Sequence, residues 1–111
     1  MSAMNDLRMY SYREVEIEII RWAEARHIIP NSTPAAQLLK AVSELGELCD
    51  AEGKKDIEKI RDGVGDTVVC LINYCALRNL DLVECLIEAY AEIKDRKGTL
   101  MPDGTFVKEG A

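Results

Sequence analysis

Two short stretches decide the fold of this chain: SELGEL, residues 43–48, and DGVGD, residues 62–66. Each lies in a run of helical periodicity and carries two carboxylates about one turn apart, on one face of its helix. Two such helices facing each other would gather Glu44, Glu47, Asp62 and Asp66 around one pocket. Carboxylates held that close repel unless a cation lies between them, and all-oxygen ligation suits Mg²⁺ or Mn²⁺.

Composition limits the class of protein. The chain has 111 residues, which favours a single domain over residues 1–111. Its net charge of −6 argues against binding a nucleic acid polymer or an anionic membrane. No apolar run is long enough to span a bilayer, and residues 1–8 lack the apolar core of a signal peptide. We therefore expect a cytoplasmic protein.

The cysteines do not form a metal motif. Cys49, Cys70, Cys75 and Cys85 include no C-x-x-C pair, and His27 is the single histidine. All four fall in predicted helices among apolar neighbours. We therefore interpret them as reduced thiols that act as small buried hydrophobes rather than as zinc ligands.

Helix signals place four helices along the chain. Ser11 with Glu14 predicts a capping box, and Thr33 followed by Pro34 is a strong helix start. The helices are expected at about 12–26, 34–51, 56–78 and 82–97, after a loose lead-in over residues 1–10. A Pro-Asp-Gly turn at residues 102–104, between short extended runs, predicts a small hairpin. The expected fold is an all-α, four-helix bundle completed by oligomerisation, with a short C-terminal β-hairpin.

Each central helix shows one apolar side and one polar arc. The apolar side of helix 34–51, expected to be buried, consists of Leu38, Leu39, Ala41, Val42, Leu45 and Leu48. Its polar arc adds Gln37 and Lys40 to the two glutamates, while Asn73 shares an arc of the next helix with the two aspartates.

The acidic pairs have a simpler interpretation as solvated helix faces. Against it, the two pairs match in periodicity, and the apolar run after Asp66 would draw this carboxylate inward, where it needs a partner or a metal. Gly63 and Gly65 each cost about 1 kcal/mol in a helix, which indicates close approach either of a second helix or of a ligand. A di-iron carboxylate site is excluded because the Glu-x-x-His pairs it needs are absent.

The ordered set of motifs resembles the MazG-like, all-α NTP pyrophosphohydrolases, and most closely their short, phage-type branch. The resemblance covers most of the chain and rests on these segments: residues 22–26, 37–40, the Glu44-x-x-Glu47 element, Gly65-Asp66 with its apolar run, residues 80–82, and residues 92–98. The family pattern is Glu-x-x-Glu followed by Glu-x-x-Asp. This chain departs from it, because Gly63 stands three residues before Asp66 and the acid is Asp62, four before. Ala91 also replaces an asparagine found in that branch.

The resemblance implies hydrolysis of (deoxy)nucleoside triphosphates to the monophosphate and pyrophosphate by a homodimer or homotetramer. Glu44, Glu47 and Asp66 would hold Mg²⁺, with Mn²⁺ as the alternative, and Asp62 would be an indirect or fourth ligand. Glu47 or Glu44 would orient or deprotonate the attacking water. The substrate-binding residues would be Gln37, Lys40, Asn73, Lys94, Arg96, Lys97 and Trp22.

Two alternatives remain open from the residues. Lys94, Arg96 and Lys97 equally suit the negative end of a helix dipole, and Trp22 suits the core as well as base stacking. The chain as a whole could instead be a non-catalytic helical nucleotide-binding or protein-interaction module, an alternative that the Gly63 and Ala91 departures support.

Overall fold

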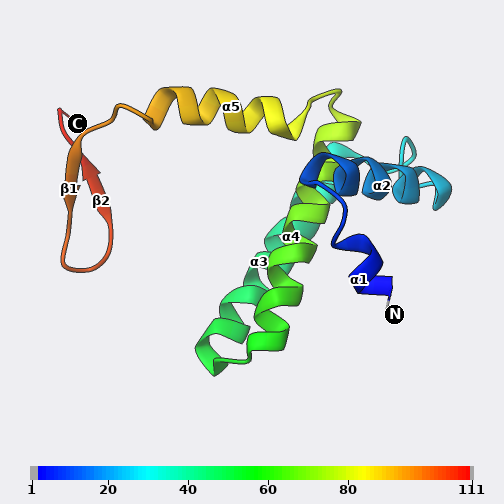
Figure 1. Cartoon of the computed structure of the whole chain (residues 1–111), viewed down its shortest axis with the longest axis horizontal. Helices are drawn as coiled ribbons and strands as arrows, with labels where there is room; N and C mark the ends of the chain where they lie inside the picture. Colours follow the sequence, from blue (N-terminus) through cyan, green and yellow to red (C-terminus); the bar gives the residue numbers. More distant parts are fainter. Residues whose placement is uncertain (1–2, 111) are drawn as a thin grey trace. The chain divides into compact units, whose positions relative to one another are not determined.

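The computed structural model describes residues 3–110, which are mostly helical, with one small antiparallel hairpin (Figure 1). This confirms the all-α class with a C-terminal hairpin and the four predicted helices, of which the last ends at Ile93 and not at residue 97 as predicted. The elements are α1 (Ala3–Leu7), α2 (Tyr12–Ala25), α3 (Pro34–Lys54), α4 (Ile57–Leu77), α5 (Leu82–Ile93), β1 (Gly98–Leu100) and β2 (Phe106–Lys108). The expected loose lead-in was wrong at α1, a helix of five residues.

The helix starts follow the capping chemistry of the sequence. The Ser11 side chain accepts the Glu14 N–H, and the Glu14 carboxylate accepts the Ser11 N–H. Thr33 caps α3, with Pro34 at its first position. The predicted end of α3 at residue 51 was too early, because the helix continues through Gly53 to Lys54. Its C-cap, Lys55, has the left-handed conformation with φ of 55°.

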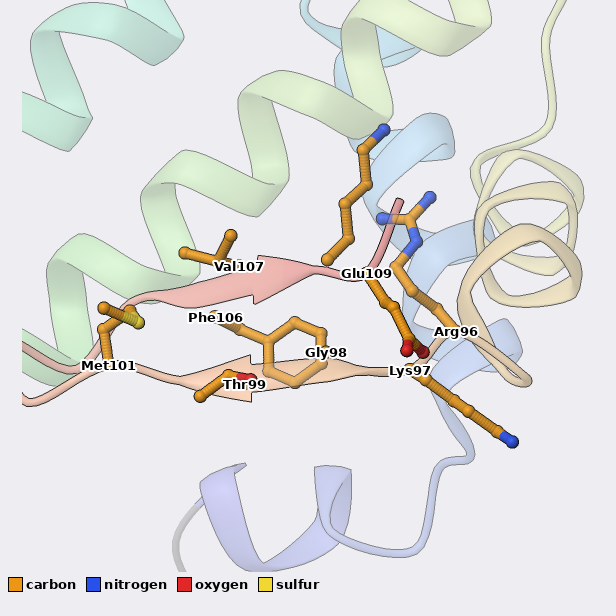
Figure 2. Close-up of a pocket in the computed structure, with 9 residues that line it drawn as sticks. Arg96, Lys97, Gly98, Thr99, Met101, Phe106, Val107 and Glu109 are labelled. Atoms are coloured by element: carbon orange, nitrogen blue, oxygen red, sulfur yellow. The ribbon is translucent and has the colours of Figure 1, made fainter. Parts of the chain in front are cut away.

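The chain falls into two compact units, one up to Asp81 and one from Leu82 onward. In the second unit, β1 pairs with β2 so that Gly98 lies opposite Lys108. A Cβ on Gly98 would lie 2.6 Å from Cζ of Phe106, whose ring lies against this glycine in Figure 2. The hairpin therefore closes in this form because position 98 carries no side chain.

The first unit is built on α3 and α4, which lie side by side (Figure 1). Its buried hydrophobic residues are mostly small: Ala23, Ala41, Ala51, Cys70, Ile72 and Cys75. The predicted apolar side of α3 was wrong for the single chain, since four of its members are exposed: Leu38, Leu39, Val42 and Leu45. The side that faces α4 instead carries Ala41, Glu44 and Ala51.

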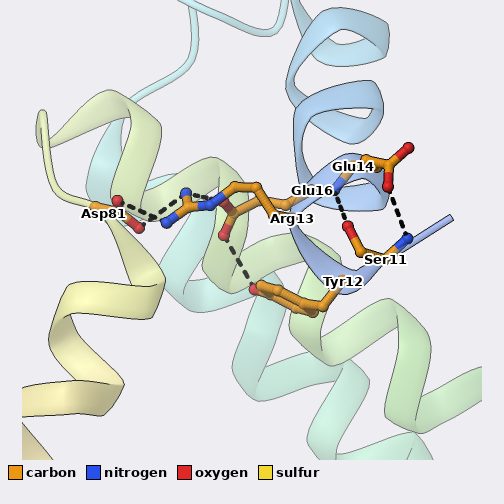
Figure 3. A network of polar contacts seen from close by, with 6 residues as sticks. All are labelled: Ser11, Tyr12, Arg13, Glu14, Glu16 and Asp81. Carbon is orange, nitrogen blue, oxygen red and sulfur yellow. Dashed lines mark hydrogen bonds and ion pairs between the residues drawn. The ribbon is translucent and has the colours of Figure 1, made fainter.

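A polar network ties the start of α2 to the end of the first unit (Figure 3). Glu16, which is 4% exposed, accepts hydrogen bonds from Tyr12 at 3.0 Å and from Arg13 at 2.6 Å. Arg13 also makes a two-pronged contact with Asp81, at 3.1 and 3.2 Å. The buried Glu16 carboxylate is thus paired with a cation and a hydroxyl donor, as the burial of a charge requires.

The cysteines are free thiols, buried at Cys70 and Cys75 and exposed at Cys49. No helix within residues 3–110 combines the length and apolar character needed to cross a membrane.

Candidate functional site

The four predicted carboxylates come from the two helices of the central pair. Glu44 lies on the side of α3 that packs against α4 and is only 8% exposed. Glu47 follows one turn later and is exposed, as is Asp62 on α4, while Asp66 is half-buried. The charges of Glu44 and Asp62 both act on Asp66, so the two acidic pairs form one electrostatic cluster.

Gly63 explains how the helices approach each other beside these acids. An added Cβ there would lie 3.1 Å from Cβ and 3.3 Å from Cα of Leu48 on α3. Of the two interpretations of this glycine, the structure therefore favours a tight helix crossing. Gly65 has open space instead, with no atom within 4 Å of the position that a Cβ would occupy. Any larger side chain at position 63 would meet Leu48, whereas the neighbouring Asp62 is exposed.

The neighbouring carboxylates raise the pKa of Glu47 and of Asp66. The pKa of Glu47 lies above its ordinary value, first because of the negative charge of Glu44 and then because of their direct side-chain contact. The pKa of Asp66 is raised first by burial and then by the charges of Asp62 and Glu44. Lys40, whose Nζ is 3.3 Å from Oε1 of Glu44, opposes both shifts. The cluster thus carries excess negative charge that one lysine does not offset.

One oxygen of the Glu44 carboxylate stands out within residues 3–110. Its Oε2 is buried and lacks a hydrogen-bond donor among the described residues. A buried carboxylate oxygen needs a proton or a cation, so the donor set fits a hard divalent cation. Within residues 3–110, however, no three acidic, cysteine or histidine side chains already stand in ligating positions. A cation bound at this cluster would therefore need some of its side chains to adopt new rotamers.

Three further predicted residues lie in the same unit. Gln37 donates to Oγ of Ser32 at 3.1 Å. Asn73 is 3% exposed, and its Oδ1 is buried with no partner among the described residues. Trp22 is 46% exposed, so its interpretation as a core residue was wrong for the single chain.

Trp22 lines a mainly apolar cavity of about 430 Å³ that reaches the acidic cluster. Asp66 lies in its wall, and the other lining residues are Leu7, Tyr10, Val15, Glu18, Ile19 and Val69. The Arg26 guanidinium lies 5.5 Å from the centre of the Trp22 ring. Sequence reasoning missed Tyr10 because it lies outside any periodic pattern, in the turn between α1 and α2.

The predicted basic residues belong to the second unit. Lys94 directly follows α5, while Arg96 and Lys97 line a cleft beside the hairpin. Lys108 lines the same cleft and was missed by sequence reasoning. The signal was available, because antiparallel pairing of the two predicted extended runs brings the residues after 107 back to those before 99.

Comparisons with known proteins place this fold. No protein-family model matches the sequence. An uncharacterized 18.2 kDa protein from the rep-hol intergenic region of Haemophilus phage HP1 (strain HP1c1) is 35% identical over 65 residues, 59% of this chain. The matched part is 40% of that phage protein's length.

A solved structure matches more of the chain. The MazG-like pyrophosphohydrolase of cyanophage S-2L, bound to dGDP and three catalytic Mn²⁺ ions per active site, superposes with a TM-score of 0.66. The match covers 90% of this chain and 98% of that one, at 20% sequence identity. This chain therefore has the all-α fold of a MazG-like pyrophosphohydrolase.

Proposed function

We propose that this protein hydrolyses (deoxy)nucleoside triphosphates to the monophosphate and pyrophosphate, with Mg²⁺ or Mn²⁺ bound by Glu44, Glu47, Asp62 and Asp66. The observation that carries the proposal is the buried, unpartnered Oε2 of Glu44 inside a cluster of mutually repelling carboxylates. The fold shared with the cyanophage enzyme, which binds dGDP and Mn²⁺, supports it.

The reaction needs a water oxygen to attack phosphorus while the bridging oxygen between the α- and β-phosphates leaves with the pyrophosphate. A bound divalent cation would lower the pKa of that water and neutralise phosphate charge. Glu47 suits the role of base, because it is exposed and its pKa is raised by Glu44. Glu44 is the alternative. Lys40, one turn from Glu44, can exchange its ion pair for a phosphate oxygen.

The cavity beside Asp66 is the best candidate for the nucleobase. Its walls are mainly apolar, and the exposed ring of Trp22 offers a stacking surface next to the acidic cluster. Asn73, on the same helix as Asp66, has a buried acceptor without a partner in the described part of the chain, and Gln37 carries an amide on α3. These amides are the proposed polar contacts to the base or sugar.

We also propose that the protein is a homodimer or homotetramer. Leu38, Leu39, Val42 and Leu45 form one continuous exposed stripe on α3, and Leu39 is 71% exposed. An apolar helix face of this kind is typical of a subunit contact. A second copy of the chain is the natural occupant, because the same stripe on its own α3 is self-complementary about a two-fold axis.

Pyrophosphate release tests the activity. Wild-type protein with Mg²⁺ or Mn²⁺ and a panel of canonical and modified NTPs should release pyrophosphate. Glu47→Gln should abolish release with an unchanged circular dichroism spectrum. Glu52→Gln, an exposed glutamate on the same helix, is the matched control and should keep wild-type turnover. Wild-type turnover in Glu47→Gln would refute the assigned site.

A non-catalytic nucleotide-binding module is the second candidate. It is favoured by the lack, in the described part of the chain, of a ready-made metal-ligating group of three side chains. Such a module would be stabilised against heat by NTP without any release of pyrophosphate.

A further inference from the structure

One face of α2 forms a wall of the mainly apolar cavity of the first unit, which we call the Trp22 cavity. The residues at i, i+3, i+4 and i+7 of this face all line it: Val15, Glu18, Ile19 and Trp22. Three of these side chains are apolar or aromatic, so Glu18 is the charged group that α2 contributes. Its position makes this carboxylate part of the cavity wall rather than of the opposite, fully solvated face of the helix.

Only one oxygen of the Glu18 carboxylate is engaged. Its Oε1 accepts a hydrogen bond from Arg21 at 2.8 Å, and 49% of the Glu18 side chain is exposed. Among residues 3–110, no donor reaches the other oxygen, Oε2. A solvated surface pair is the simpler interpretation of Glu18 and Arg21, and such pairs contribute little to stability. That interpretation gives no role to the second oxygen or to the place of Glu18 on the cavity face.

Trp22 sets the place where a base would stack. The Arg26 guanidinium lies over the ring, 5.5 Å from its centre, which leaves the other face of the ring for a base. Glu18 precedes Trp22 by one turn, and side chains four apart on a helix have Cβ atoms about 5–6 Å from each other. Helical side chains lean towards the N-terminus, so the ring leans towards Glu18. A base stacked on Trp22 therefore has an edge within reach of this carboxylate.

The chemistry of a carboxylate limits which base edges it accepts. An ionised carboxylate only accepts hydrogen bonds, and the exocyclic amino groups of adenine, cytosine and guanine donate them. A carbonyl in the same position, as in uracil or thymine, would face the carboxylate with a second acceptor. Asp66, the other carboxylate of the described cavity wall, belongs to the acidic cluster. Glu18 is thus the carboxylate left for the base.

We propose that Glu18 is a specificity-determining residue, which selects nucleotides whose base carries an exocyclic amino group. Adenine, cytosine and guanine belong to this class, whereas uracil, thymine and hypoxanthine do not. The inference rests on the proposed function for its ligand and deepens it, because Trp22 stacks on any base and offers no choice among them. A site built to pair with an N–H donor rejects the analogue that lacks it, since its own polar group is then left unpaired.

Quenching of Trp22 fluorescence by uncharged nucleosides tests this inference apart from catalysis. Trp22 is the single tryptophan of the chain, so the signal reports this cavity. Deoxycytidine is compared with deoxyuridine, and deoxyadenosine with deoxyinosine, on the whole protein in EDTA. Each pair exchanges an amino group for a carbonyl, and the amino nucleoside should bind about tenfold more tightly, the size of one charge-assisted hydrogen bond. Absence of quenching by all four nucleosides, or equal affinities within both pairs, would overturn the inference.

Glu18→Gln assigns the selectivity to its residue. An amide both accepts and donates, so it serves a carbonyl as well as an amino group, and the two affinities in each pair should become nearly equal. Glu24→Gln removes the same charge from an exposed position of α2 outside the cavity lining and should keep the wild-type ratio. Circular dichroism checks that both variants are folded. A wild-type ratio in Glu18→Gln, or the same loss of selectivity in both variants, would overturn the inference.

Pyrophosphate release distinguishes failure of this inference from failure of the proposed function. If wild type hydrolyses dCTP and dUTP with equal kcat/KM and discriminates neither nucleoside pair, base selection by Glu18 is wrong and the activity stands. If the nucleosides are discriminated and Glu18→Gln abolishes the difference, while no NTP releases pyrophosphate, base selection stands and the activity is wrong.

Discussion

Gly63 and Gly65 lie two residues apart on α4 and should respond to alanine in opposite directions. At both positions alanine gains about 1 kcal/mol of helix propensity. At position 65 nothing lies within 4 Å, so this gain should appear in full. At position 63 the new methyl would lie 3.1 Å from Cβ and 3.3 Å from Cα and Cδ1 of Leu48.

Relief of that contact requires α3 and α4 to separate, because two of the three close atoms are Cα and Cβ of Leu48 rather than the end of its side chain. Overpacking of this kind costs about 1–3 kcal/mol. After the propensity gain, Gly63→Ala should be destabilised by about 0–2 kcal/mol. The free energies of unfolding of the two variants should therefore differ by about 1–3 kcal/mol.

Thermal denaturation of both variants at one protein concentration measures the difference. For a chain of this size about 1 kcal/mol corresponds to roughly 4 °C, so the two Tm values should differ by about 4–12 °C. Helix separation also moves the acidic pairs apart, so Gly63→Ala should bind Mn²⁺ more weakly than Gly65→Ala. Equal Tm shifts in the two variants would refute the tight crossing at Gly63.

The remaining predictions concern the acidic cluster, the buried network of α2 and the outer stripe of α3. Glu44→Gln should bring the pKa of Glu47, followed by carbon-detected NMR titration, back towards its ordinary value, and should remove thermal stabilisation by Mg²⁺ or Mn²⁺. Burial and the hydrogen bond to Glu16 raise the pKa of Tyr12 to about 12, above the value near 10 of an unfolded chain. The interaction therefore stabilises the folded protein fully below pH 10, and this stabilisation is lost as the pH rises through 12. In urea titrations the free energy of unfolding of wild type should exceed that of Tyr12→Phe by an amount that shrinks between pH 10 and pH 12. A difference that does not change with pH would contradict this role of Tyr12. Leu39→Glu should lower the mass seen by light scattering to that of a smaller assembly, while an unchanged mass would exclude this stripe as a subunit contact.

The helices were predictable because their signals are local. Capping at Ser11 and Thr33 depends on residues within one turn, and the structure confirms both. The end of α3 was harder to predict, because glycine commonly ends a helix whereas Gly53 lies inside this one. No described atom lies within 4 Å of the position that a Cβ on Gly53 would occupy. The helix α1 has only five residues, which is too short for a helical periodicity to be recognised in the sequence.

Burial was less predictable, because hydrophobicity does not say what will cover a face. The pattern identified Leu38, Leu39, Val42 and Leu45 as one apolar side, but in the single chain they are exposed. No local signal marked Glu16 as a buried residue either, since its partner Arg13 is held in place by Asp81, 68 residues further along the chain. Such pairings depend on tertiary geometry.

The arrangement of α3 connects the proposed site with the proposed assembly. An ordinary surface helix turns its apolar side to the core, whereas α3 turns Glu44 towards α4 and Leu39 towards solvent. In an isolated chain both choices cost free energy, because one oxygen of the buried Glu44 carboxylate has no hydrogen-bond partner among the described residues and apolar surface stays in water. We infer that a cation between the helices and a second copy on the outer stripe offset these two costs. Divalent cation and protein concentration should therefore each raise Tm, and the cation effect should remain in Leu39→Glu because the two faces of α3 are separate.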